Sequence, residues 1–493
     1  MYDVLVMGAG PAGIAAAERA ARLGAKVCLL DARRAGGTDA VSGVVPARTL
    51  AQIAQLKRTA DDLGRYGIKV GIPELDFGRA LGRCREVIEE VHASKEVLAR
   101  DLGKGQALDV FECVGEARFV DPQRVVLPNG RVLEADAYIL CTGGHPRRPD
   151  FPGSALSLVP SDLWQPGAKL PSSTVILGTG HTGVQVASIL ADFGCKVHLL
   201  ERGPQILSHE DHDLAEAVRA AFVERGIDVV TGVGDDRSIA KDGDELLFRY
   251  STEDGNQEIR CEAVVVSLGW TPNTIALGLD VAGVDVDDRG FIQVTDSLQT
   301  SQPHIFAAGD VTGRRMLVPA AMQEGYVAAG NAVVGTRDPV RHQVVSAGGY
   351  PFPEHGSVGL TEAEARCQHE VEVATVPYSE NPRAIIDGRT YGFCKLVVDR
   401  RSHRILGAHV VGERAVEVVQ LVATGMATGL RVEQLAAVDL AYPTYVQIVG
   451  EAAYRICLAL GIELHETLVP STQGATVASP KIALRGSNMP CFI

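Results

Sequence analysis

Two glycine-rich segments have the residue types and spacing that suit the binding of a pyrophosphate. The first reads Gly8-Ala9-Gly10-Pro11-Ala12-Gly13, and the second reads Gly178-Thr179-Gly180-His181-Thr182-Gly183. In such a turn the first glycine permits a tight bend, the second lets the backbone approach the phosphates, and the third lets a helix pack closely. Each segment is therefore expected to hold a pyrophosphate at a helix N-terminus, where unpaired N–H groups favour anions.

An acidic residue follows each segment at the same distance. Asp31 and Glu201 each stand 23 positions after the first glycine (8 to 31 and 178 to 201), at the end of a short apolar run. A carboxylate at this point accepts hydrogen bonds from ribose hydroxyls. Two copies of one arrangement predict two dinucleotide sites.

Strands and helices that position these turns are expected on either side of them. For the first turn, the sequence predicts strands at 3–7 and 26–30 with a helix between them that ends near Leu23. For the second, it predicts strands at 174–177 and 196–200 with a helix that ends near Phe193. This strand, turn, helix and strand order is that of a nucleotide-binding α/β unit.

The second acid indicates which pyridine nucleotide is preferred. Glu201 would repel the 2′-phosphate of NADP, so NAD(H) is expected more than NADP(H). Arg202 keeps the alternative open, because a guanidinium at that place can accept the phosphate.

Composition excludes several other classes of protein. The 493 residues suggest roughly three domains at about 150 residues each. With 47 Lys and Arg against 61 Asp and Glu, the net charge is −14, which argues against general nucleic-acid binding. No apolar run approaches the roughly 18 residues of a membrane span. The ten cysteines show no C-x-x-C spacing, so neither a zinc site, another metal site nor a disulfide framework is expected. Without a basic, then apolar, leader the expected location is the cytoplasm.

Five further segments carry a recognisable pattern: 139–149 (ILCTGGHPRRP), 269–273 (GWTPN), 306–310 (FAAGD), 392–396 (GFCKL) and 405–412 (ILGAHVVG). Together with the two glycine turns, they resemble the flavoprotein pyridine-nucleotide disulfide oxidoreductases. That family includes dihydrolipoamide dehydrogenase, glutathione reductase, mercuric reductase and soluble transhydrogenase. The resemblance covers roughly residues 1–465.

The resemblance implies an α/β fold with two Rossmann-like domains and a C-terminal α+β dimerisation domain. The FAD-binding domain is expected at 1–150 and 271–338, the NAD(P)-binding domain at 151–270, the dimerisation domain at 339–465 and a tail at 466–493. Pro- and Gly-rich stretches near 146–153 and 337–353 agree with these cuts. A homodimer is implied, with each subunit completing the other's site.

Cofactor contacts are expected at positions drawn from the two turns and the family segments. They are Gly8, Gly10, Pro11, Ala12, Gly13, Asp31, Ala32, Gly37, Thr38, Arg48, Ala117, Thr142, Gly143, Asp310, Pro319, Ala320, Gly178, Gly180, His181, Thr182, Gly183, Glu201 and Gly269. The cofactors implied are FAD and a pyridine nucleotide.

The chain departs from the family at its redox site. The family's two active cysteines fall in a segment that here reads GGTDAVSGVVPAR at 36–48, with Asp39 at the first cysteine position and Val44 at the second. Only a thiolate exchanges with a disulfide, so neither residue replaces the dithiol.

The family's His-Pro-x-x-x-Glu dyad is also replaced, since 442–447 reads Tyr442-Pro-Thr-Tyr-Val-Gln447. By the same resemblance Arg48 stands in place of a lysine near the flavin, Gln185 in place of its glutamate partner, and His181 in place of an aromatic gate over the nicotinamide pocket.

These losses agree with one another and predict that electrons leave the flavin directly, for a small acceptor such as a quinone. Arg48, Gln185, Tyr442 and Asp39 are the candidate catalytic residues. Asp39 is either a proton donor or a filler of the cysteine site that bonds backbone. Tyr442 is either a proton donor across the dimer or a structural hydroxyl. Cys491 in the tail cannot form a redox pair alone.

The main functional hypothesis is an FAD-dependent NAD(P)H oxidoreductase of quinone-reductase or diaphorase type. The alternatives are a soluble pyridine-nucleotide transhydrogenase, and a redox-inactive flavoprotein with a binding or assembly role.

Overall fold

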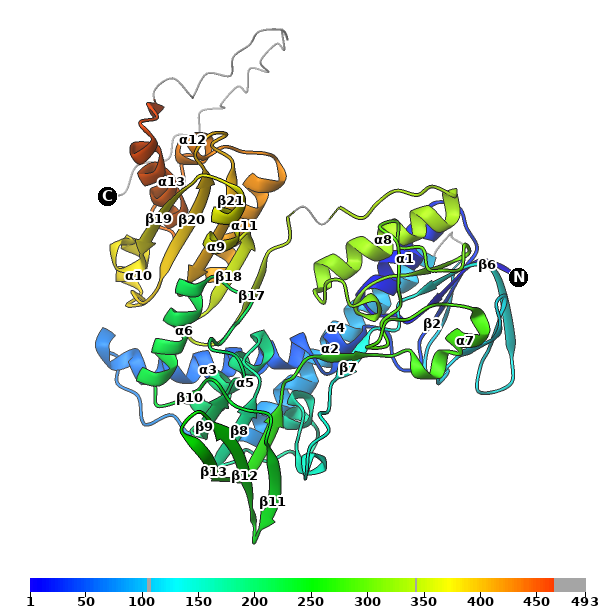
Figure 1. Cartoon of the computed structure of the whole chain (residues 1–493), viewed down its shortest axis with the longest axis horizontal. Helices are drawn as coiled ribbons and strands as arrows, with labels where there is room; N and C mark the ends of the chain where they lie inside the picture. Colours follow the sequence, from blue (N-terminus) through cyan, green and yellow to red (C-terminus); the bar gives the residue numbers. More distant parts are fainter. Residues whose placement is uncertain (104–107, 342–343, 465–493) are drawn as a thin grey trace.

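The computed structural model describes residues 1–103, 108–341 and 344–464, and the expected tail at 466–493, with Cys491, lies outside the described residues. The chain forms three units, each built around its own main β-sheet, and Figure 1 shows them as three lobes. We call them the first, second and C-terminal units, according to the order in which their sheets begin along the chain.

The first unit is a seven-stranded sheet in the order β3-β2-β1-β6-β5-β4, with β16 added on β6. The strands β1, β2, β3, β6 and β16 run parallel, whereas β4 and β5 extend the sheet in antiparallel fashion. Their bounds are β1 (Tyr2–Met7), β2 (Val27–Leu30), β3 (Leu108–Phe111), β4 (Arg118–Asp121), β5 (Arg124–Val126), β6 (Val132–Leu140) and β16 (Ile305–Ala307).

Small side chains place the helices of this unit close to the sheet. Helix α1 (Pro11–Arg22) buries Ala12, Ala16 and Ala20, which share one core with β1 and with α8 (Val318–Val334). The other helices from this part of the chain are α2 (Gly37–Val41), α3 (Val44–Asp62), α4 (Phe77–Gly103) and α7 (Leu279–Ala282), of which α3 and α4 share a core with the helix at His181–Asp192 of the second unit. Because alanine adds little bulk, the N-terminus of α1 sits directly over the end of β1.

The second unit is a four-stranded parallel sheet in the order β10-β9-β8-β14, next to the antiparallel sheet β11-β12-β13. The strand bounds are β8 (Ser173–Leu177), β9 (Lys196–Leu200), β10 (Asp228–Val230), β11 (Ser238–Asp242), β12 (Glu245–Thr252), β13 (Gly255–Cys261) and β14 (Ala263–Val266). Its helices are α5 (His181–Asp192) and α6 (His212–Glu224). The expected strand–turn–helix–strand order is thus present twice.

A short antiparallel ribbon joins these two units. Strand β7 (Gly144–Pro146) pairs with β15 (Trp270–Pro272), so that Gly144 faces Pro272. The chain therefore leaves the first sheet and returns to it at neighbouring points. Helix α3 also packs on α5, because Leu50 and Ala54 belong to the core that contains Val186 and Leu190.

The C-terminal unit is an antiparallel sheet in the order β17-β18-β21-β20-β19, covered by helices. Its strands are β17 (Ala347–Gly349), β18 (His355–Gly359), β19 (Val371–Pro377), β20 (Phe393–Asp399) and β21 (Ile405–Val411). Its helices are α9 (Glu362–Gln368), α10 (Pro382–Ile386), α11 (Ala415–Ala427), α12 (Val432–Ala436) and α13 (Gln447–Leu460). Short 3-10 turns elsewhere are η1 (Leu63–Tyr66), η2 (Ser154–Leu156), η3 (Pro160–Trp164), η4 (Ile275–Leu277), η5 (Asp310–Thr312) and η6 (Tyr378–Glu380).

A buried lysine attaches the C-terminal unit to the second unit. Lys395 on β20 is 3% exposed, and its Nζ lies 2.9 Å from Asp211 Oδ1 and 2.9 Å from Asp213 Oδ2, at the start of α6. Glu362 Oε2 on α9 lies 2.6 Å from the same Nζ. Burial opposes the charge, but these three carboxylates raise the pKa of Lys395 well above its ordinary value. The ammonium group therefore stays charged across the physiological range.

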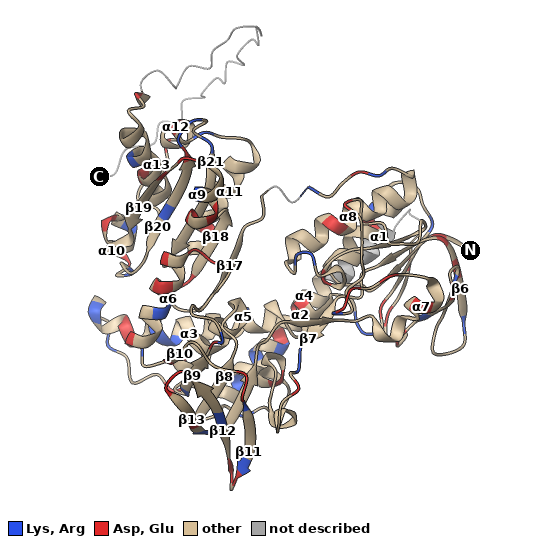
Figure 2. Cartoon of the chain, viewed as in Figure 1, with Lys and Arg blue, Asp and Glu red and all other residues tan. Residues whose placement is uncertain are grey.

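Acidic and basic side chains are interspersed over the three units, as Figure 2 shows. Within the described ranges, no helix combines the length and apolar character that crossing a bilayer requires. Over the same residues, no group of three His, Cys, Asp or Glu side chains is arranged to hold a metal ion.

Candidate functional site

The first glycine turn follows β1 and tolerates no side chain at two positions. Gly8 has a φ of +102°, and a Cβ there would lie 2.3 Å from the carbonyl oxygen of Cys141. A Cβ on Gly13 would lie 1.7 Å from the carbonyl oxygen of Gly8. The helix N-terminus is thereby pressed against the turn, with its first N–H groups directed outward where an anion binds.

The acid of the first turn braces the turn itself. Asp31 accepts hydrogen bonds from the backbone N–H of Ala9 at 2.6 Å and of Arg33 at 2.8 Å. Burial raises the pKa of Asp31, and these two backbone hydrogen bonds oppose that rise. Asp31 also lines the adjoining cavity, where its remaining lone pairs can accept from ribose hydroxyls.

The segment after β2 covers this turn. Gly37 has a φ of +66°, and a Cβ there would lie 2.8 Å from Cα of Gly10. The covering segment continues as α2, which carries Thr38 and Asp39, and both side chains line the cavity. The first turn is therefore enclosed by the chain that follows it.

A half-buried carboxyl also lines the cavity. Asp310, at the start of η5, has a pKa raised to about 6 by burial and by the nearby Glu324 carboxylate. Glu324 is fully buried and accepts a hydrogen bond from the N–H of Gly309 at 2.7 Å. Asp310 can therefore donate or accept a hydrogen bond near neutral pH, which suits a polyhydroxyl chain.

These features surround one cavity of about 1430 Å³. That volume exceeds the roughly 300–1,000 Å³ of ordinary small-molecule pockets. A dinucleotide fits it, because the glycines leave a cradle that a Cβ would fill and two carboxyls face inward. The expected site residues that line it are Gly8, Gly10, Pro11, Ala12, Asp31, Ala32, Gly37, Thr38, Asp39, Ala117, Thr142, Gly143, Gly180, His181, Thr182, Gln185, Gly269 and Asp310.

Several other expected residues lie behind the wall or away from it. Gly13, Gly178 and Gly183 support the turns, Ala320 is buried in α8, and Pro319 beside it is exposed. Arg48, Glu201 and Tyr442 are likewise absent from the cavity wall.

The second glycine turn repeats the geometry of the first. Gly178 has a φ of +97°, and a Cβ there would lie 2.4 Å from the carbonyl oxygen of Ser267. A Cβ on Gly183 would lie 1.9 Å from the carbonyl oxygen of Gly178. The N-terminus of α5, with Gly180 and His181, opens into the same cavity.

The Glu201 carboxylate accepts its hydrogen bonds from residues of the second turn and its own loop. It accepts hydrogen bonds from the N–H of Thr179 at 3.2 Å and of Gly203 at 2.8 Å, and also from the Thr179 hydroxyl. Arg202 is 73% exposed and lies 3.7 Å from Asp235, which is a loose contact. The acid and the neighbouring cation are thus both at the edge where an adenosine ribose of a second nucleotide would lie.

Arg48 is separated from the cavity by the ring of Tyr350. Its guanidinium is 3.5 Å from the centre of the Tyr350 ring, and Tyr350 lines the cavity. The backbone N–H of Tyr350 donates to Gln185 Oε1 at 3.3 Å, so Gln185 and Tyr350 are held together. Behind them, burial raises the pKa of Glu354 to about 7, despite the opposing effect of Arg48. Arg48 can therefore act on the cavity through the Tyr350 ring.

His181 takes part in a small cluster at the cavity edge. Its Nδ1 lies 3.0 Å from Nε2 of His355, and its Nε2 lies 3.2 Å from Oε1 of Glu210. The two imidazole rings are nearly parallel, with centres 5.2 Å apart and planes inclined by 17°. The cluster joins the start of α5 to β18 of the C-terminal unit.

Tyr442 is not brought to the cavity within one chain. Its side chain is 73% exposed, and it precedes Thr444, whose N–H donates to Gln447 Oε1 at 3.2 Å. Within one chain, Tyr442 therefore does not line the cavity.

The described residues that line the cavity include one cysteine, whose thiol is buried. Cys141 is the cysteine among the lining residues, and the described cysteines are all free thiols. Burial raises the pKa of the Cys141 thiol, and Glu324 adds to that rise. A thiol held in its protonated form is a poor nucleophile.

Three site residues were not expected from the sequence: Tyr350, Glu210 and His355. Tyr350 and His355 reach the site through contacts between the C-terminal and second units, and Glu210 reaches it from a loop of the second unit that carries no periodic pattern. No local signal in the sequence identifies such contacts.

Comparison with known proteins agrees with this architecture. The family model described as pyridine nucleotide-disulphide oxidoreductase matches residues 2–325, and its dimerisation-domain model matches residues 345–453. Dihydrolipoyl dehydrogenase of Geobacillus stearothermophilus is 31% identical over 472 residues, covering 94% of this chain and 97% of that protein. Mercuric reductase of Bacillus cereus is 31% identical over 438 residues, covering 88% of this chain and 68% of that protein.

Among solved structures, the HOCl-induced flavoprotein disulfide reductase RclA from Escherichia coli superposes with a TM-score of 0.81 at 25% identity, covering 92% of this chain and 99% of that one. The fold class expected from the sequence is confirmed. The chain belongs to the pyridine nucleotide-disulphide oxidoreductase family of flavoproteins, and it is an FAD-dependent oxidoreductase.

Proposed function

We propose that this enzyme passes electron pairs from NAD(P)H through FAD directly to a small acceptor, a quinone being the first candidate, without a redox-active cystine. The observation that carries the proposal is the covering segment over Gly10, where Asp39 and Val44 line the cavity at the positions of the family's two cysteines. Its relatives include proteins named as disulfide reductases, and thiol exchange needs a thiolate that this segment cannot provide.

The residues present fit FAD in the first unit. The N-terminus of α1 would hold the pyrophosphate, Asp31 the adenosine ribose, and Asp310 the ribityl chain. Bound FAD would supply the two-electron carrier. The chain's own contribution is to enclose it under α2 and to place Tyr350, backed by Arg48, at the cavity wall.

NADH is proposed as the preferred donor at the second turn. The Glu201 carboxylate, held by Thr179 and Gly203, would repel a 2′-phosphate. We further propose a homodimer in which Tyr442 of one subunit reaches the cavity of the other. The match of 345–453 to the dimerisation domain and the exposed Tyr442, Tyr454 and Leu458 support it. Its mass in solution tests the dimer.

The experiment is anaerobic mixing of the holoenzyme with NADH, followed by menadione, lipoamide or oxidised glutathione. Loss of the visible flavin band with NADH and its return with menadione, but not with either disulfide, is expected. Reoxidation by a disulfide, or inhibition of the reduced enzyme by arsenite, would overturn the proposal. A flavin band that NADH leaves unchanged would favour the redox-inactive alternative.

A paired variant sharpens this test. Replacing Asp39→Cys together with Val44→Cys restores both thiols to the covering segment. If the wild type works without thiols, only this double variant gains a long-wavelength thiolate-to-flavin absorption on reduction. The same band in the wild type would contradict the proposal.

One observation keeps transhydrogenase as a second candidate. Arg202 is 73% exposed and only loosely paired, so it is available to the phosphate of NADPH. Reduction of thio-NAD by NADPH at a rate comparable with menadione reduction by NADH would favour this second activity.

A further inference from the structure

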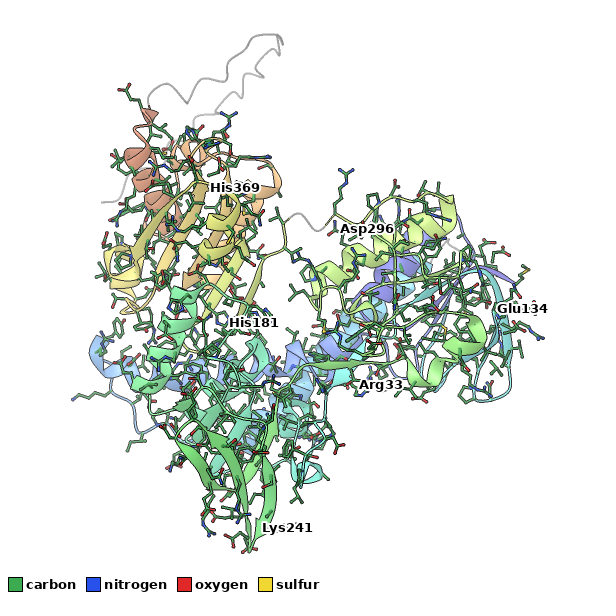
Figure 3. All side chains as sticks on the ribbon, viewed as in Figure 1. Arg33, Glu134, His181, Lys241, Asp296 and His369 are labelled. Atoms are coloured by element: carbon green, nitrogen blue, oxygen red, sulfur yellow. The ribbon has the colours of Figure 1, made fainter. Side chains whose placement is uncertain are left out.

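The cluster of His181, Glu210 and His355 places an imidazole in the wall of the cavity with a buried negative charge behind it. Figure 3 labels His181 where the second unit meets the C-terminal unit. The His181 side chain is 40% exposed and lines the cavity, Glu210 is 6% exposed, and His355 is fully buried. The three residues come from α5, the loop before α6, and β18.

The hydrogen bonds define where the protons are. Burial alone would raise the pKa of Glu210, but the hydrogen bond and charge of His181 outweigh it and lower that pKa. Glu210 is therefore a carboxylate, which can only accept, so Nε2 of His181 carries a proton. Besides these two groups and Ser357, which is hydrogen-bonded to Glu210, the cluster's other titratable member is His355.

His355 is a neutral partner. Burial and the proximity of His181 lower the pKa of His355 to about 3, and its Nδ1 has no hydrogen-bond partner among the described residues. A neutral imidazole either donates from Nε2 to His181 or accepts there. The contact at 3.0 Å is satisfied in both cases, so it does not determine which of the two nitrogens carries the hydrogen.

We propose that His181 is the acid that protonates the reduced acceptor, with Glu210 as its counter-charge and His355 as a positioning residue. This inference rests on the function proposed above. It also specifies on which side of the cavity the acceptor binds. Because His181 lines the cavity at the second glycine turn, where the pyridine nucleotide is proposed to bind, the acceptor would overlap the donor's site. Donor and acceptor then bind in alternation.

The proton balance of this step is closed. A quinone takes up two electrons and two protons to become a hydroquinone. The electron pair arrives with one hydrogen as hydride on one oxygen, and the second oxygen takes its proton from the His181 imidazolium. His181 is left as a neutral imidazole and regains a proton from solvent through its exposed edge. Delivery requires the ring to turn from Glu210, and the 3.2 Å contact there is already long for a charged hydrogen bond.

The test separates the two half-reactions in the His181→Phe and Glu210→Gln holoenzymes. Because His181 borders the proposed nucleotide site, the flavin of each protein is first fully reduced with dithionite, and only its reoxidation is compared. Reoxidation of His181→Phe by menadione should slow by about a hundredfold or more, the usual range for a lost general acid. Ferricyanide, which takes single electrons and no proton, should reoxidise both proteins equally. Glu210→Gln should shift the pH profile of menadione reoxidation to lower pH, with little change at low pH.

A measurement on the cofactor-free protein gives a second readout. Isotope-labelled histidine should show the coupling between the His181 and His355 rings across their hydrogen bond; this coupling should disappear in His355→Phe, whereas the Nε2–H signal of His181 toward Glu210 should remain. As a matched control, His198→Gln removes another histidine–carboxylate pair, with Asp228 at 2.8 Å, that is not part of the cavity wall. This control should leave both half-reactions unchanged.

The outcomes distinguish the two proposals. If NADH fails to reduce the wild type, or menadione fails to reoxidise it, the proposed function is wrong regardless of His181. If the wild type behaves as proposed but His181→Phe is reoxidised by menadione at the wild-type rate, or is slowed equally with ferricyanide, the acid role of His181 is wrong. If steady-state kinetics show that NADH and menadione bind together rather than in turn, the proposal that they share one side of the cavity is wrong.

Discussion

The two glycine turns are built alike but are covered differently. In both, a Cβ on the third glycine would collide with the carbonyl oxygen of the first, at 1.7 Å for Gly13 and 1.9 Å for Gly183. Over the first turn, however, the backbone of Gly37 reaches Gly10, whereas a Cβ on Gly180 would meet no described atom within 4 Å. One phosphate-binding device thus serves an enclosed site, suited to a retained cofactor, and an open site, suited to an exchanging one.

The acids of the two turns differ in the same sense. Asp31 lines the cavity while it braces its turn, whereas Glu201 lies outside the cavity wall and accepts three hydrogen bonds from Thr179 and Gly203. Asp31 is placed to act on a bound molecule directly. In the function proposed above, Glu201 would act mainly by its charge, which would favour NADH over NADPH.

The largest effects are expected when a methyl group is added to the third glycine of each turn. Gly13→Ala should yield protein without flavin, because the helix must move from the turn, at a cost of about 3 kcal/mol or more. Gly183→Ala should keep flavin but lose about a hundredfold in the rate of its reduction by NADH. Absorbance of the purified proteins and rapid-mixing kinetics measure both. Equal loss of flavin in the two variants would show that the turns do not act separately.

Exchanging the acids for amides should have smaller and unequal effects. Asp31→Asn removes a charged acceptor and should weaken FAD retention by about 1.5–3 kcal/mol. Glu201→Gln should leave FAD in place and lower the preference for NADH over NADPH about tenfold, since the repulsion of the 2′-phosphate is gone. Flavin release and kcat/KM with each nucleotide are the measurements. A NADPH preference unchanged in Glu201→Gln would contradict the role given to that charge.

The enclosed site should also show itself in the pH dependence of the cofactor-free protein. Because the pKa of Asp310 is raised to about 6, the folded chain keeps a proton there that the unfolded chain loses near pH 4. The free energy of unfolding should therefore fall as the pH rises from about 4 to 6, by at most about 3 kcal/mol. Asp310→Asn should remove this fall. Thermal unfolding of both apoproteins across that window measures it, and parallel curves would be evidence against the assignment.

The smallest effect is expected at the open edge. Arg202→Gln breaks an exposed contact of 3.7 Å with Asp235, so stability should change by no more than about 0.5 kcal/mol. Use of NADPH should fall a few-fold, while KM for NADH stays the same. Denaturant titration and steady-state kinetics check both parts. A larger loss of stability would mean that Arg202 supports the turn rather than only facing solvent.

The sequence predicted what depends on local spacing. Strands expected at 3–7 and 196–200 lie at Tyr2–Met7 and Lys196–Leu200, and both turns adopt the backbone that their glycines require. The family expectation is confirmed as well. The roles of Asp39, Arg48, Gln185 and Tyr442 remain predictions.

Contacts between units were beyond the reach of the sequence. His181 and His355 are 174 positions apart, and Gln185 meets Tyr350 across 165. Such pairs depend on how folded units dock, which no periodicity records. For the same reason, no pattern in the sequence indicates that Tyr350 lies between Arg48 and the cavity.

The buried ammonium of Lys395 has a consequence for how the molecule comes apart. Pulling β20 away from α6 would leave the buried Asp211 carboxylate without the Lys395 cation that pairs with it, which is a costly intermediate. Partial separation of β20 from α6 is therefore disfavoured. The slowest amide exchange on β20 and on α6 should share one protection factor, because both elements must unravel in the same cooperative event.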